Sequence, residues 1–186
     1  MTECDGVVSP KSLEPWDCVT KASVETMSAT CGVTIEPSDQ DGDPAGGDMM
    51  VAIISLVGEV DWSVSLGLPR ETATALAASF AGFEISFEDP DMSDAVGELA
   101  NIFAGQAKSL LSRQGVKANI SLPTVMSGRS LDILAQPGAL TRKACFHSDA
   151  GKLWVGVSVG KRTPKQTFLR PADQHEPAKG AAERPA

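Results

Sequence analysis

Basic residues are scarce in this sequence and are nowhere gathered into a cluster. Its 186 residues include 16 Lys and Arg against 24 Asp and Glu, which gives a formal net charge of −8 and a pI near 4.7. A surface with this charge repels nucleic acid and anionic membranes at neutral pH. We therefore expect neither nucleic acid nor a membrane among the partners.

Long apolar runs are also missing. The longest apolar stretch, Met49 to Val57, is far shorter than the roughly 20 residues that a membrane-spanning helix needs. Residues 1–11 have neither the basic start nor the apolar run of a signal peptide. These absences predict a cytoplasmic protein.

Cysteine and histidine are too few and too scattered for a zinc site. The cysteines are Cys4, Cys18, Cys31 and Cys145, with no C-x-x-C spacing, and the histidines are His147 and His175. Structural zinc sites need several such ligands at close spacing. We predict no metal site and reduced, buried thiols. A Ser–His–Asp or Cys–His catalytic device is not excluded, but no local signature supports one.

An acidic loop, residues 38–48, offers a different metal hypothesis. Its aspartates alternate as at the start of an EF-hand loop, which also requires Gly at the sixth position and Glu at the twelfth. Pro44 and Met50 stand at those positions, so calcium binding is rejected.

The strongest local pattern is a long helix predicted from about Asp91 to Gln114. Asp89, Asp91 or Ser93 can cap its start, Pro90 suits a first turn, and Gly115 suits the left-handed position after its end. At about 100° per residue, one side of this helix is apolar and forms the predicted core stripe, which consists of Val96, Leu99, Phe103 and Leu110.

A second stripe on the same helix is polar and carries the candidate site. It spans an arc of roughly 80° and contains Asp94, Glu98, Asn101, Gly105 and Lys108. Glu98 and Asn101 are three residues apart, so their side chains are neighbours on the helix surface. Gly97 and Gly105 each cost about 1 kcal/mol of helix stability relative to alanine. On spacing alone, a merely solvated face, with Gly97 packing against a neighbouring helix, is the favoured explanation.

The motif Asp94-x-x-x-Glu98-x-x-Asn101, followed by Ile102-Phe103-Ala104-Gly105, resembles the signature of the CheC/CheX/FliY family of chemotaxis phosphatases. The segments Glu14-Pro15-Trp16, Val24 to Met27 and Ser121 to Gly128 are also similar to parts of that family. The resemblance covers roughly Leu13 to Lys161. The chain has one motif copy where CheC-like members usually have two, so the resemblance points to the CheX branch or to a diverged relative.

The rest of the chain predicts an α+β fold, with helices packed on one face of a mostly antiparallel sheet. The domain extends over residues 12–162, between an N-terminal tail (1–11) and a C-terminal tail (163–186) whose composition predicts disorder. The expected elements are a helix over Leu13–Cys31, a hairpin over Met49–Val57 and Glu59–Leu66, a helix over Pro69–Ala81, strands over Ala118–Met126 and Leu131–Ile133, and a hairpin over Leu140–His147 and Lys152–Val159.

The resemblance implies that the substrate is the aspartyl phosphate of a CheY-like receiver domain. It implies that Asn101 orients the attacking water and that Glu98 docks on the receiver's active-site lysine. Asp94, Gly97, Gly105 and Lys108 would form the surrounding contact. The receiver would supply Mg²⁺, so this chain needs no cofactor of its own. The resemblance also implies a homodimer joined through sheet edges.

Two other functions remain open at this stage. One is a module of the same fold that binds a receiver or a flagellar switch component without hydrolysis, and the other is a structural dimer with no receiver partner. One departure from the family is Gln106, where members often have Asn. On the helical wheel this position lies toward the core, so we expect little effect on the site.

Overall fold

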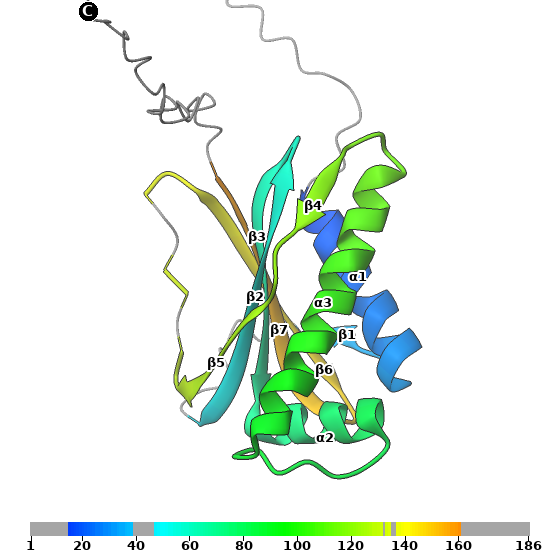
Figure 1. Ribbon diagram of the computed structural model, residues 1–186, viewed down its shortest axis with the longest axis vertical. Helices are drawn as coiled ribbons and strands as arrows, with labels where there is room; N and C mark the ends of the chain where they lie inside the picture. The colour runs from blue at the N-terminus through cyan, green and yellow to red at the C-terminus, as the bar shows by residue number, and fades with distance from the viewer. Residues whose placement is uncertain (1–14, 39–46, 132, 135–136, 161–186) are drawn as a thin grey trace, which may run out of the picture.

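The structure, a computed structural model, describes residues 15–38, 47–131, 133–134 and 137–160. In this part of the chain three helices cover one face of an antiparallel sheet (Figure 1). The helices are α1 (Pro15–Cys31), α2 (Arg70–Ala81) and α3 (Pro90–Ser112). The strands are β1 (Glu36–Pro37), β2 (Asp48–Gly58), β3 (Asp61–Pro69), β4 (Ala118–Ile120), β5 (Thr124–Arg129), β6 (Leu140–Ser148) and β7 (Gly151–Val159). The predicted fold class is confirmed.

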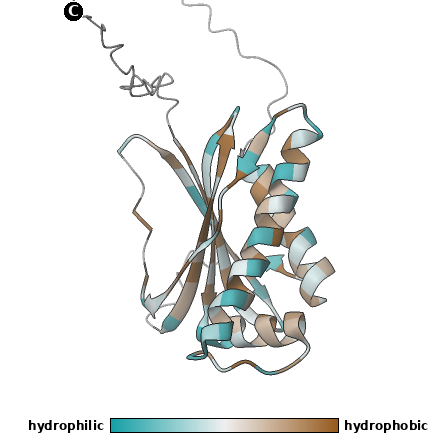
Figure 2. Ribbon diagram, in the orientation of Figure 1, coloured by the Kyte–Doolittle hydropathy of each residue, from teal (hydrophilic) through white to brown (hydrophobic). Residues whose placement is uncertain are grey.

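The strands lie in the order β1-β6-β7-β3-β2-β4, and β5 also pairs with β2. Both predicted hairpins are present as β2–β3 and β6–β7. Alternate residues of β2 face opposite sides of the sheet: Met50 and Ile54 belong to the main core under the helices, whereas Met49 and Val51 pack with Trp154 on the other side. The expectation that both faces of this apolar strand are covered is confirmed. Figure 2 shows mainly hydrophobic residues along β2.

The helix α3 forms where the sequence predicts it. Asp89 caps its start and accepts a hydrogen bond from the backbone N–H of Asp91 at 3.0 Å, and Pro90 occupies the first turn. Gly115 follows the helix with φ of +82°, a left-handed conformation that glycine adopts without strain. The predicted core stripe is buried: Val96, Leu99, Phe103 and Leu110 are at most 6% exposed.

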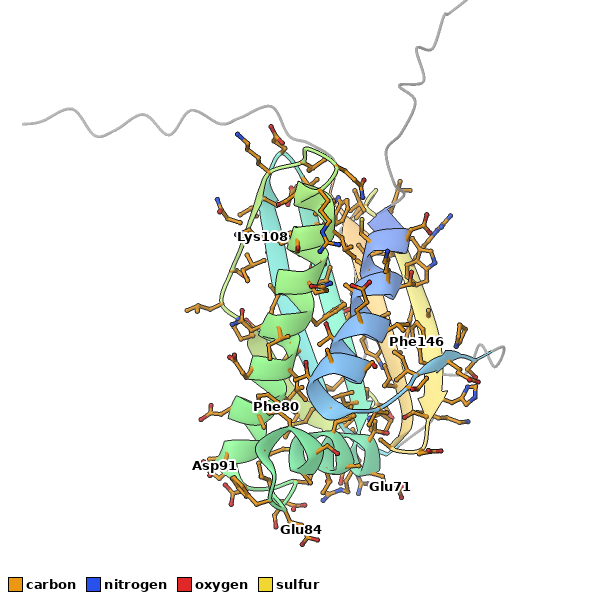
Figure 3. The ribbon with its side chains drawn as sticks, turned by 90° about the vertical axis from the view of Figure 1, so that its right-hand side faces the viewer. Glu71, Phe80, Glu84, Asp91, Lys108 and Phe146 are labelled. Carbon is orange, nitrogen blue, oxygen red and sulfur yellow. The ribbon has the colours of Figure 1, made fainter. Side chains whose placement is uncertain are left out.

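Helices α1 and α3 lie side by side on the sheet, and α2 crosses near one end of α3 (Figure 3). Gln106 of α3 donates to Glu25 of α1, and Gln114 donates to the Sγ of Cys18 at 3.7 Å. The two helices therefore run in opposite directions. Gln106 is half-buried and turned toward α1, as the helical wheel predicts.

Two expected strands need correction, and several other expectations concern residues outside the described part of the chain. The strand expected over Ala118–Met126 is interrupted between Ile120 and Thr124, and gives the separate strands β4 and β5. The lesser strand expected over Leu131–Ile133 is wrong, because Leu131 and Ile133 are not in a strand; they pack as loop residues on the second, smaller core. Leu13, both tails, Cys4, His175 and the aspartates of the acidic loop before Gly47 are outside the described residues.

Gly105 inside α3 and Gly115 after its end allow a matched test of the helix. A methyl group at Gly105 would meet no described atom within 4 Å, so Gly105→Ala should raise the free energy of unfolding by about 1 kcal/mol through helix propensity alone. The same change at Gly115 should lower it by a similar amount, because alanine is strained at φ of +82°. Urea denaturation of both variants checks the pair; destabilisation by Gly105→Ala would contradict the open surface over this position.

Candidate functional site

The polar stripe of α3 faces away from the sheet. We call Asp94, Glu98, Asn101, Gly105 and Lys108 the polar face. Asp94 and Glu98 are exposed, and the other three residues are half-buried. Between Glu98 and Asn101 the helix rises by about 4.5 Å, so their side chains leave the same patch of surface. Asn101 is thus open to an incoming molecule, and the fold does not enclose it.

The polar face has no internal partners within the described residues. None of its four side chains, those of Asp94, Glu98, Asn101 and Lys108, forms a hydrogen bond or an ion pair with another described residue. The carboxamide of Asn101 keeps one acceptor oxygen and two N–H donors for water or a visiting group. The carboxylate of Glu98 likewise keeps its acceptors. This arrangement is suited to receiving a second molecule.

One flank of the polar face is helix α1. Glu25 accepts from Gln106, and Cys18 lies buried where the two helices meet. Burial raises the pKa of the Cys18 thiol, and the pKa of Cys31 is raised for the same reason. A raised pKa favours the protonated thiol at neutral pH over the thiolate, which is the reactive form. Cys18, Cys31 and Cys145 are free of disulfides. Cys18 is buried as expected, whereas Cys31 and Cys145 are only half-buried.

The other flank is the segment between β4 and β5. A Cβ atom at Gly97 would lie 3.5 Å from Val125 and 3.6 Å from Pro123, so this segment packs directly on the helix there. Gly97 is buried, and it faces a strand segment instead of a neighbouring helix. The prediction that Gly97 gives clearance to a docking partner therefore needs correction. Gly105 differs, because no described atom lies over it within 4 Å.

An ion-pair cluster holds the start of α3, and the sequence analysis missed it. Arg70 bonds Asp48 at 2.7 Å and Glu88 at 2.5 Å, and its guanidinium lies 4.2 Å from the ring centre of Phe87. Arg129 bonds Asp48 at 3.1 Å. Arg70, followed by Arg129, lowers the pKa of Asp48, and Arg70 also lowers the pKa of Glu88.

These charges come from four separate parts of the chain, so no local motif could have revealed them. Both carboxylates have lowered pKa values, so the stabilisation that they contribute is present above their ordinary pKa range. It is lost as the pH falls and the carboxylates are protonated. The cluster ties the loop before α3 to β2 and β5. It therefore positions the helix without contributing to the polar face.

Within the described ranges no group of three His, Cys, Asp or Glu side chains is placed to hold a metal ion. No helix of the described part has the length and hydrophobicity to span a membrane.

Known proteins with similar sequences come from bacterial chemotaxis. The family described as chemotaxis phosphatase CheX matches residues 50–146, which include the whole of α3. The CheY-P phosphatase CheX of Thermotoga maritima is 34% identical over 85 residues, which make up 45% of this chain and 55% of that protein. The match thus spans about half the length of the curated relative.

Solved structures show the same fold. The chemotaxis protein CheX from Desulfovibrio desulfuricans superposes with a TM-score of 0.69 at 24% identity, over 80% of this chain and 100% of that chain. The CheX chain of the CheX-CheY-BeF3-Mg+2 complex from Borrelia burgdorferi gives 0.65 at 19% identity, over 81% and 100%. With the family match over more than half of its length, the chain belongs to the CheX family of the CheC-like chemotaxis phosphatases.

Proposed function

We propose that this protein hydrolyses the aspartyl phosphate of a CheY-like receiver domain in a response regulator. Three findings support the proposal. The chain belongs to a phosphatase family, its curated relative is a CheY-P phosphatase, and a solved relative is in complex with CheY, BeF3 and Mg²⁺. The observation that carries it in this molecule is that Glu98 and Asn101 are adjacent and outward-facing, with no partner among the described residues.

The reaction requires little from this chain besides placement. A water oxygen bonds to phosphorus as the bond from phosphorus to the aspartate oxygen breaks. Inorganic phosphate and a free carboxylate result, and the proton of the water passes to phosphate or solvent. Catalysis of phosphoryl transfer consists mainly of positioning and charge stabilisation. Mg²⁺ held by the receiver would neutralise charge on the phosphoryl oxygens.

Asn101 is assigned the placement of the water. Its carboxamide can accept a hydrogen bond from the water and can donate one to the phosphoryl group. The side chain projects from a helix whose other side is buried through Leu99 and Phe103, so the backbone that carries it is held in place before the receiver arrives. Placing one water in line would supply about 3–4 kcal/mol of barrier lowering if the acceleration is 10²–10³-fold.

Glu98 is assigned docking. An exposed carboxylate is a weak base at neutral pH, so proton abstraction is a poor role for it. An ion pair with the lysine beside the receiver's phosphorylation site would seat α3 across that site. Asp94 and Lys108 lie farther along the polar face and would contact the receiver's rim, and Gly105 would leave clearance for its backbone. A receiver partner would place the protein in the cytoplasm.

We predict that Asn101→Ala strongly reduces turnover and leaves binding intact. The variant should lower kcat for phosphorylated receivers by about 10²–10³-fold, because the water loses its orienting amide. Affinity for the beryllofluoride-activated receiver should change less than about twofold. Asn119→Ala is the matched control, since Asn119 is exposed on β4 and is the other asparagine of the chain.

Phosphate release from a panel of CheY-like receivers, with calorimetric titration of the same receivers, measures both quantities. Undiminished turnover in Asn101→Ala would refute its role. Binding without any turnover in the unmodified protein would identify a non-catalytic binding module instead.

Glu98→Lys should weaken docking, because it places two positive charges together at the receiver's lysine. We expect the Kd for the activated receiver to rise at least about tenfold at low salt, with a smaller loss at high ionic strength. Glu71→Lys on α2 makes the same charge change on an exposed residue away from α3 and should have little effect. Equal Kd values for Glu98→Lys and the unmodified protein would exclude this docking role.

We also propose a homodimer through the β6 edge of the sheet. On its outer side β6 pairs with the two-residue strand β1 through Phe146 and His147, and Leu140 near its other end is 76% exposed. A second copy could extend the sheet there in a symmetric, antiparallel pair. Light scattering after gel filtration should give about twice the chain mass of 19.4 kDa. A single-chain mass at the highest assay concentration would contradict the dimer.

A further inference from the structure

The segment between β4 and β5 contains one more residue than the strand beside it. Ile120 pairs with Leu56, and Thr124 pairs with Ile53. Between these two pairs the β4–β5 segment advances by four residues, whereas β2 advances by three. The extra residue makes Ser121, Leu122 and Pro123 a β-bulge. Such bulges change the direction of side chains at sheet edges and beside functional sites.

Hydrogen bonds fix the bulge to β2. The backbone N–H of Ser121 donates to the carbonyl oxygen of Ser55 at 2.9 Å, and the N–H of Ser55 donates to the Oγ of Ser121 at 3.0 Å. The hydroxyl of Ser121 donates in turn to the carbonyl oxygen of Leu122 at 2.9 Å. The backbone and the hydroxyl of Ser121 thus connect the bulge to β2.

Pro123 fixes the same segment to α3. It packs over Gly97, which is adjacent in sequence to Glu98 and one helical turn before Asn101. Figure 1 shows the β4–β5 segment running alongside this part of the helix. Between its two anchored neighbours, Leu122 is 88% exposed. A large apolar side chain is therefore held in solvent, on a fixed backbone, at the edge of the polar face.

We propose that Leu122 is a docking anchor for the receiver, and this inference rests on the proposed function. While Glu98 and Asn101 enter the phosphorylation site, Leu122 contacts an apolar part of the receiver surface next to it. The anchor contributes binding energy equally before and during hydrolysis, so it affects Kd and KM and leaves kcat unchanged. Because receivers differ in their surfaces, Leu122 helps to select which receivers are substrates.

The chain offers a matched control. Leu134 is also 88% exposed, but it lines a groove of about 590 Å³ with Ser63, Ser65 and Trp154, on the face of the sheet opposite the helices. Leu122→Ser and Leu134→Ser therefore remove the same apolar surface at two different places. Both positions are exposed, so both variants should fold, which circular dichroism and the urea midpoint can verify.

We expect Leu122→Ser to raise the Kd for the beryllofluoride-activated receiver and the KM for the phosphorylated receiver about tenfold, with kcat within about twofold of the unmodified protein. Leu134→Ser should change neither constant. Leu122→Met, which conserves volume and hydrophobicity, should restore the affinity.

Three results would overturn the inference. They are an unchanged Kd and KM in Leu122→Ser, an equal loss in Leu134→Ser, and a fall from dimer to monomer mass in Leu122→Ser, which would place Leu122 between copies of this chain. Failure of the proposed function would give a different result, because the unmodified protein would then bind receivers without releasing phosphate. In that case the comparison of Kd values would still test Leu122 as an anchor. If no receiver binds, both proposals are refuted.

Discussion

Packing of α3 against the sheet determines where every part of the candidate site lies. Leu99 and Phe103 are almost completely buried, and burial of each such side chain contributes about 1.5–3 kcal/mol. A rotation of the helix that exposed them would therefore be costly. Since the polar face lies on the opposite side of the same helix, the free energy that folds the domain also fixes the direction of Glu98 and Asn101.

Two neighbours limit the remaining freedom of α3. On one side, α1 packs against it and is connected through the Gln106–Glu25 and Gln114–Cys18 contacts. On the other side, Pro123 and Val125 pack over Gly97. The ion-pair cluster around Arg70 fixes the loop that leads into the helix. The polar face therefore lies between two elements that hold α3 in place.

The features that the sequence predicted are those with a local physical cause. Helix periodicity identified the buried and exposed sides of α3, and Asp89, Pro90 and Gly115 marked its ends. The bulge at Leu122 was missed because its cause is the register of two distant strands, β2 and β5, and the hydroxyl of Ser121. The residues of the Arg70 cluster are separated by up to 81 positions, so only the folded chain brings them together. The helical wheel suggested that Gly97 is open to a partner, because a wheel represents one helix alone and omits the strand that packs on it.

Asn101 and Glu98 have no partner among the described residues, so the residues that stabilise the fold differ from those that are assigned to the chemistry. Neither side chain supports another described residue, so its replacement leaves the core, the helix ends and the sheet untouched. Under the proposed function, hydrolysis would therefore be lost or regained through single substitutions at the surface, with no intermediate that fails to fold.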